Sequence, residues 1–162
     1  MSTVFTEFLR DLAAKKTAEE RAGKGTVDDW REALEKLFGK IRSWLAESDP
    51  DGIIHIEQRD HDLSEQGLGH YRVPRLDLQI MGKWIGIIPK ARKTVATATL
   101  SQGSAPERAA GRVDITDETR RYVLLRFPQQ GADELWLIDD LGSGPRPLDQ
   151  KTFEQALMSY LQ

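Results

Sequence analysis

The spacing of the apolar residues changes at Pro50–Gly52, and this change constrains the fold more than any other feature of the chain. Before it, apolar residues recur at alternating intervals of four and three, at Trp30, Leu34, Leu37, Ile41 and Trp44. After it, apolar and polar residues alternate, as they do in a strand with one wet face. Because Pro50 and Gly52 do not continue a helix, the sequence predicts an α+β fold with helices first and strands after them.

Two N-terminal helices and one C-terminal helix are expected. The first spans 3–22, with Thr3 as its N-cap, and the second spans 26–48, with Thr26 as its N-cap. Gly23 and Gly25 lie between them and indicate a break. The third helix spans 149–161 and begins after Asp149, another N-cap residue type.

Between the helices, residues 53–140 contain short β segments separated by turn residues. The connections are too short for parallel crossovers, so an antiparallel meander of six or seven strands is predicted. The order of strands followed by one helix resembles that of pleckstrin-homology-like barrels, and an open sheet fits equally well. The sequence therefore predicts either a partly closed barrel or an open sheet.

The segment "MGKWIGIIPKARK" (81–93) predicts the second strand of a hairpin. With Met81–Gly82 as a two-residue turn, the predicted pairs are Ile80 with Lys83, Leu78 with Ile85, and Leu76 with Ile87. Four of these side chains then share the core face: Leu76, Leu78, Ile85 and Ile87. Trp84 and Ile88 go to the opposite face, with Arg75 and Gln79.

The 162 residues are expected to form one domain, 1–162, because domains of this size are common. The chain contains no cysteine, which fits a reducing compartment and excludes disulfides and thiolate metal sites. The first residues do not resemble a secretory signal, and no apolar run reaches the length of a membrane span. We therefore expect a soluble, cytoplasmic protein with no membrane association.

Charge is unevenly distributed along the chain, although the net charge is only −3. Residues 47–65 contain seven acids and one arginine, whereas residues 72–93 contain six bases and one aspartate. These segments either face each other or form a bipolar surface for a charged partner.

The basic hairpin is one candidate binding site. An aromatic side chain among basic ones is the arrangement with which single-strand binders stack bases. The candidate residues are Arg75, Lys83, Trp84, Lys90, Arg92 and Lys93. The alternative is an ordinary strand with solvated ends.

The three histidines lie close together in the sequence, and they suggest a second candidate site. His55 and Glu57 share a face of their strand, so with His61 they form a candidate set of mixed nitrogen and oxygen metal ligands. This set would belong to a metal-dependent hydrolase. A polar surface cluster explains the same residues without a metal.

No catalytic residue and no cofactor is predicted, because the sequence contains no P-loop, no dinucleotide-binding fingerprint and no nucleophile elbow. The preferred interpretation is a non-catalytic protein-interaction module of the accessory, adaptor or immunity type. It would bind another polypeptide, or a second copy, through a sheet face or the leading helices. Nucleic-acid binding through residues 72–93 is the first alternative, and the metal-dependent hydrolase is the second.

Overall fold

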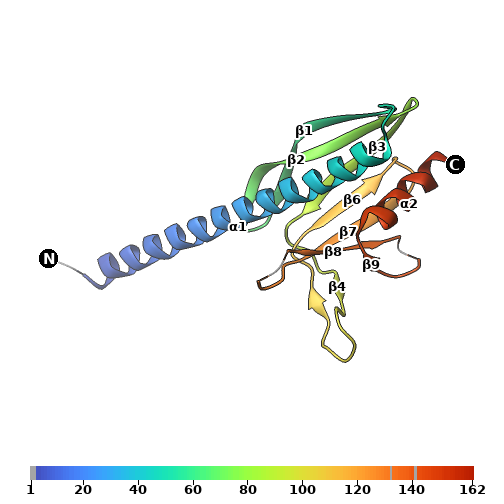
Figure 1. Ribbon diagram of the computed structural model, residues 1–162. Coiled ribbons are helices and arrows are strands. Elements are labelled where there is room, and N and C mark those ends of the chain that lie inside the picture. Colours follow the sequence, from blue (N-terminus) through green and yellow to red (C-terminus); the bar gives the residue numbers. More distant parts are fainter. Residues whose placement is uncertain (1–2, 132, 141) are drawn as a thin grey trace.

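The structure is a computed structural model that describes residues 3–131, 133–140 and 142–162. The described residues form the helices α1 (Val4–Ser48) and α2 (Gln150–Leu161), with the strands between them (Figure 1). The strands are β1 (Ile54–Glu65), β2 (Gly69–Ile80), β3 (Lys83–Ala91), β4 (Thr97–Ala98), β5 (Glu107–Arg108), β6 (Arg112–Thr116), β7 (Arg121–Phe127), β8 (Leu135–Asp139) and β9 (Arg146–Pro147). The α+β class and the antiparallel sheet are confirmed.

Seven of these strands form one open antiparallel sheet in the order β1-β2-β3-β6-β7-β8-β9, so the barrel alternative is wrong. The expected continuous meander over 53–140 is also corrected. After β3 the chain leaves the sheet, forms the separate two-stranded pair β4–β5, and returns as β6 beside β3. The segment 92–111 is therefore an excursion from the main sheet.

The two expected N-terminal helices are one helix, and the predicted break between 22 and 26 is wrong. Thr3 caps α1 as predicted, but Thr26 lies inside the helix and its hydroxyl donates to the Ala22 carbonyl at 3.0 Å. A glycine in a helix costs only about 1 kcal/mol relative to alanine, so packing of the following turns outweighs it. Gly23 also passes close to the β1–β2 turn, where a Cβ atom would lie 3.3 Å from the Gly67 oxygen.

Both helices pack on one face of the sheet and form the main core with it. Trp30 of α1 stacks on Trp136 of β8 with ring centroids 6.3 Å apart, and Trp44 contacts Phe153 of α2 at 5.8 Å. The predicted hairpin register is confirmed pair by pair. Its four predicted core residues are fully buried: Leu76, Leu78, Ile85 and Ile87. The C-terminal helix begins after Asp149 as predicted, with a reciprocal capping box to Thr152.

The other face of the sheet is covered only in part. Ala98 and Ala109, from the β4–β5 excursion, pack on a second apolar cluster of β7 and β8. The sheet residues of that cluster are Val123, Leu125, Phe127, Leu135 and Leu137. Over β1, β2 and β3 this face has no helix above it, because both helices lie on the opposite side.

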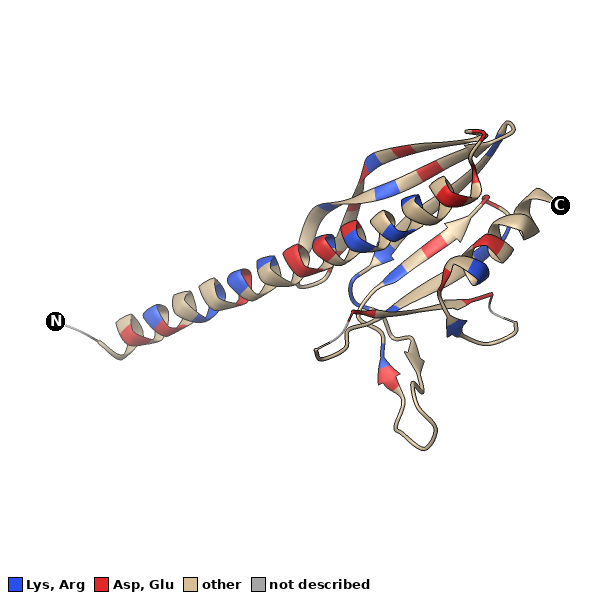
Figure 2. Cartoon of the chain, viewed as in Figure 1, with Lys and Arg blue, Asp and Glu red and all other residues tan. Residues whose placement is uncertain are grey.

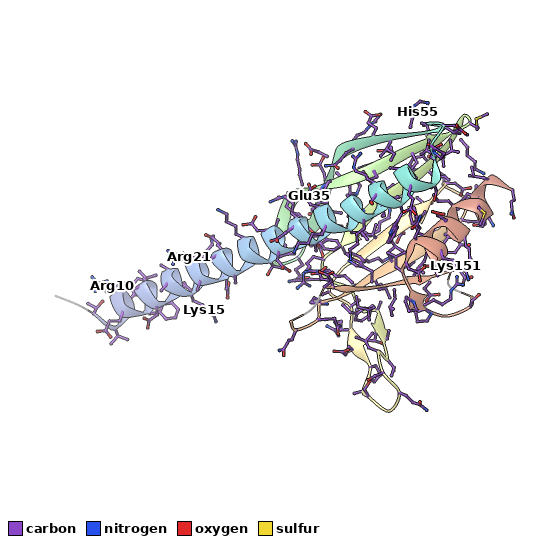
Figure 3. All side chains as sticks on the ribbon, in the orientation of Figure 1. Arg10, Lys15, Arg21, Glu35, His55 and Lys151 are labelled. Carbon is purple, nitrogen blue, oxygen red and sulfur yellow. The ribbon has the colours of Figure 1, made fainter. Side chains whose placement is uncertain are left out.

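The N-terminal part of α1 projects from the body as a helical arm, which we define as residues 3–22 (Figure 1). Apart from Thr6, every residue of the arm is exposed. Lysine, arginine and acidic residues are interspersed along it (Figure 2). The side chains of Arg10, Lys15 and Arg21 point away from the helix axis with no other element near them (Figure 3). No described helix combines the length and apolar character needed to cross a membrane.

Candidate functional site

The uncovered face of β1–β3 contains a hollow of about 1030 Å³. It is lined by residues of β1, β2 and β3, by the last residue of β6 and by the β6–β7 turn. These residues are His55, Ile56, Glu57, Arg59, Arg75, Asp77, Gln79, Trp84, Ile88, Lys90, Thr116 and Glu118. The hollow therefore mixes acids and bases around one aromatic ring.

Trp84 lies flat on the sheet within this hollow. Its ring covers Gly86, where a Cβ atom would lie 2.5 Å from the indole, so only glycine permits this orientation. The indole nitrogen of Trp84 donates to a carboxylate oxygen of Asp77 at 2.8 Å. Trp84 is half-buried, so it is fixed on one side and open toward the hollow on the other.

Asp77 is the buried acid that holds this arrangement. Arg75, two residues earlier on the same face of β2, donates to both of its oxygens, at 3.1 and 2.6 Å. Burial alone would raise the pKa of Asp77, but hydrogen bonds from Arg75 and Trp84 outweigh it and lower that pKa. Asp77 is therefore an ionised anchor for two side chains, and its oxygens are occupied.

The same arrangement, an arginine bonded to the aspartate two residues later, recurs on β6. Arg112 donates to both oxygens of Asp114, at 2.8 and 3.2 Å, and Asp114 is 1% exposed. Arg121 of β7 adds a third contact at 3.8 Å. Alternate residues of a strand share a face, so each arginine folds back over its own aspartate. Arg121, on the neighbouring strand, is thus a secondary contact of Asp114.

His61 and Lys90 lie at the edge of this region. Burial lowers the pKa of His61, and the positive charges of Arg75 and Lys90 lower it further. Lys90 lines the hollow, and among the described residues no acid forms an ion pair with it. Lys90 is therefore a positive charge of the hollow without an ion-pair partner among the described residues.

The six candidate binding residues of the hairpin separate into two groups. Arg75, Trp84 and Lys90 meet in the hollow. The other three do not line it: Lys83, Arg92 and Lys93.

Each of these three has a structural role elsewhere. Lys83 lies on the opposite side, where its ammonium donates to the Tyr160 carbonyl at the end of α2. The backbone amides of Arg92 and Lys93 donate to the Glu65 carboxylate, at 3.0 and 2.9 Å. The acidic and basic segments therefore do meet, at Glu65.

The three candidate metal ligands do not form a site. His55 and Glu57 line the hollow, whereas His61 lies farther along β1. Within the described ranges no group of three or more histidine, aspartate or glutamate side chains is arranged to hold a metal ion. Glu57 instead accepts a hydrogen bond from Arg59 at 2.9 Å.

The arm carries an apolar stripe that lies outside the two apolar clusters of the body. Its four residues are largely exposed: Phe5 (66%), Phe8 (57%), Leu9 (46%) and Leu12 (52%). One signal in the sequence does separate this stripe from the core. Along the same helix face, Lys16, Glu19 and Gly23 follow before the buried Val27, so the apolar surface is interrupted.

Comparisons with known proteins add no assignment, since no protein-family model, curated protein or solved structure matches this chain.

Proposed function

We propose that this protein is a non-catalytic protein-interaction module, of the accessory, adaptor or immunity type, that binds another polypeptide through its N-terminal arm. The observation that carries the proposal is the exposed stripe of the arm. Phe5, Phe8, Leu9 and Leu12 stand at positions i, i+3, i+4 and i+7. These are the anchor positions of an amphipathic helix that lies in an apolar groove of its partner.

Energetics support a bound arm. Four large apolar side chains of the arm are exposed, so most of their apolar surface contributes no burial free energy to the free protein. Complete burial of one phenylalanine or leucine contributes about 1.5–3 kcal/mol. Burial of the stripe in a groove of a partner would therefore contribute free energy to binding, and packing within this protein does not provide it.

The charges of the arm favour an apolar partner surface. Its four acids (Glu7, Asp11, Glu19 and Glu20) balance its four bases (Arg10, Lys15, Lys16 and Arg21). A helix that bound phosphates would carry an excess of basic residues. Because the chain lacks cysteine, we place this interaction in the reducing cytoplasm.

Affinity purification from the native host tests the proposal with two triple variants. The stripe variant carries Phe5→Ser, Phe8→Ser and Leu12→Ser, and the control variant carries Glu7→Gln, Arg10→Gln and Asp11→Asn on the polar side. We expect a stoichiometric complex, measured by size-exclusion chromatography with light scattering, for the wild type and the control only. The proposal would be contradicted if the stripe variant formed the same complex as the wild type. It would also be contradicted if the wild type and both variants were monomers without a partner.

Single-stranded nucleic acid is a second candidate ligand, and the open side of Trp84 beside the positive charge of Lys90 favours it. The expected result is salt-dependent binding of a fluorescent oligonucleotide, weakened by Trp84→Phe and by Lys90→Ala. The arm variants serve as controls because they lie outside the hollow. No change in anisotropy at low salt would exclude this candidate.

A further inference from the structure

Strand β1 is a long open edge of the main sheet. It pairs with β2 over twelve residues without a register shift, and it contains no proline. At the opposite edge, β9 has only two residues. An open edge presents unpaired backbone groups to which another strand can add. β1 is therefore the sheet edge at which the described part of the chain can accept a strand.

The turn between β2 and β3 fixes which backbone groups of β1 point outward. Met81 and Gly82 have positive φ angles of 52° and 81°, as in a two-residue hairpin turn, so Ile80 hydrogen-bonds with Lys83. Along β2 the hydrogen-bonding direction alternates, which directs Gln79 toward its β1 partner His55. Odd-numbered residues of β1 thus bond to β2, and even-numbered ones point away.

A contact at the start of β1 agrees with this assignment. The amide of Ile54 donates to Asp49 at 2.8 Å, so it does not bond to β2. The remaining outward positions are Ile56, Gln58, Asp60, Asp62 and Ser64. An added antiparallel strand would place a residue directly opposite each of them, within a hydrogen-bonded pair.

Two of these outward positions are aspartates. No described residue forms an ion pair or hydrogen bond with the Asp60 carboxylate, and Asp62 pairs only with the exposed Arg72, at 3.0 Å. β1 as a whole contains four acids and one arginine. Like charges directly opposite each other in a sheet are destabilising, whereas opposite charges stabilise the pairing. The edge therefore disfavours a second copy of itself and favours a basic strand.

We propose that β1 accepts an extended basic segment of another polypeptide as an added antiparallel strand. Lysine or arginine would stand opposite Asp62 and Asp60, and an apolar residue opposite Ile56. In chain order the segment reads basic-x-basic-x-polar-x-apolar. This interaction is independent of the arm, because α1 residues before 23 lie outside the sheet (Figure 1).

The probe is a capped, fluorescent peptide with the sequence TTKTKTQTV, whose third and fifth residues face Asp62 and Asp60. We expect saturable binding by fluorescence anisotropy to the full-length protein. The double substitution Asp60→Asn and Asp62→Asn should weaken it at least tenfold, and a peptide with glutamate in place of both lysines should not bind. Absence of saturable binding by the lysine peptide would overturn the proposal.

Backbone methylation separates strand addition from simple charge attraction. In the bound register the amides of the two lysines point toward β1, whereas the amides of the intervening threonines point away. N-methylation at the lysines should abolish binding, and N-methylation at the threonines between and after them should preserve it. Equal binding by both methylated peptides would overturn the proposal in favour of non-specific attraction.

A protein variant provides a matched test. Gln58→Pro removes an outward amide and leaves the bonds to β2 intact, so the fold should persist and peptide binding should be lost. If this variant does not fold, the methylated peptides still decide the outcome. A dimer in light scattering that Gln58→Pro converts to monomer would overturn the proposal, because it would assign the edge to a second copy.

Discussion

The indole ring of Trp30 packs directly on the backbone of Gly111. A Cβ atom at position 111 would lie 2.4 Å from the ring, and Trp30 is fully buried. Gly111→Ala should therefore overpack the core and lower the free energy of unfolding by about 1–3 kcal/mol. Urea denaturation measures the difference.

Gly39→Ala is the matched control for this substitution. Gly39 lies on the exposed side of α1, and a Cβ atom there would meet no atom within 4 Å. The substitution should raise stability by up to about 1 kcal/mol through helix propensity. Destabilisation by both alanines to the same extent would show that the Trp30–Gly111 contact is not the cause.

Arg126 joins α1 to the β7–β8 hairpin. Its guanidinium is 1% exposed, donates to Asp29 at 2.9 Å and to Glu134, and lies 5.9 Å from the centre of the Trp30 ring. Arg126→Met should lower the free energy of unfolding by about 2–3 kcal/mol, because Glu134 loses its partner. The exposed Arg121→Met should change it by no more than about 1 kcal/mol. Equal midpoints in urea for the two variants would refute this role.

Acid should weaken the β6–β7 turn through Asp117. Burial raises its pKa, but backbone amides of Arg120 and Thr119 donate to its carboxylate and hold the pKa at about 2. A folded-state pKa below the unfolded value contributes stability that is present above about pH 4 and is lost as pH falls toward about 2. Asp117→Asn should therefore be less stable than the wild type at neutral pH and equal to it near pH 2. The urea midpoints of the two proteins are compared at each pH. A difference between them that stays constant from neutral pH to pH 2 would show that titration of Asp117 is not the cause.

The hollow can be monitored through His61. Its pKa lies below the ordinary 6.5, first because of burial and then because of Arg75 and Lys90. Since the neutral form is favoured in the folded state, this contribution to stability is present above pH 6.5 and declines as pH falls. Lys90→Gln should raise the His61 pKa in an NMR titration, and Lys24→Gln on α1 should not. Identical titration curves for the two variants would show that the charge of Lys90 does not lower the His61 pKa.

Local rules predicted the hairpin because its turn determines the pairing. Met81 and Gly82 supply the left-handed backbone of a two-residue turn, and alternation then assigns each side chain to a face. The same alternation separates Lys83 from Trp84, so the grouping of both in one binding site contradicted the predicted register. The bond from Trp84 to Asp77 depends on how a side chain leans across two strands, which residue spacing does not reveal.

The long helix was not predictable from local signals. Gly23 and Gly25 are poor helix formers, and Thr26 is a good cap residue, so short-range preferences favour a break. Packing of Val27 and Trp30 against the sheet overrides those preferences. The arm is helical because it continues a helix that distant strands have already stabilised.

The continuity of α1 has a geometric consequence for the arm. Leu12 and Trp30 are eighteen residues apart, which corresponds to five turns at 3.6 residues per turn. The stripe of the arm is therefore in rotational phase with the helix face that packs on the sheet. One inserted or deleted residue between 13 and 22 would rotate the stripe by about 100° about the helix axis. Substitutions there preserve the direction in which the protein presents its docking surface, whereas a change of length redirects it.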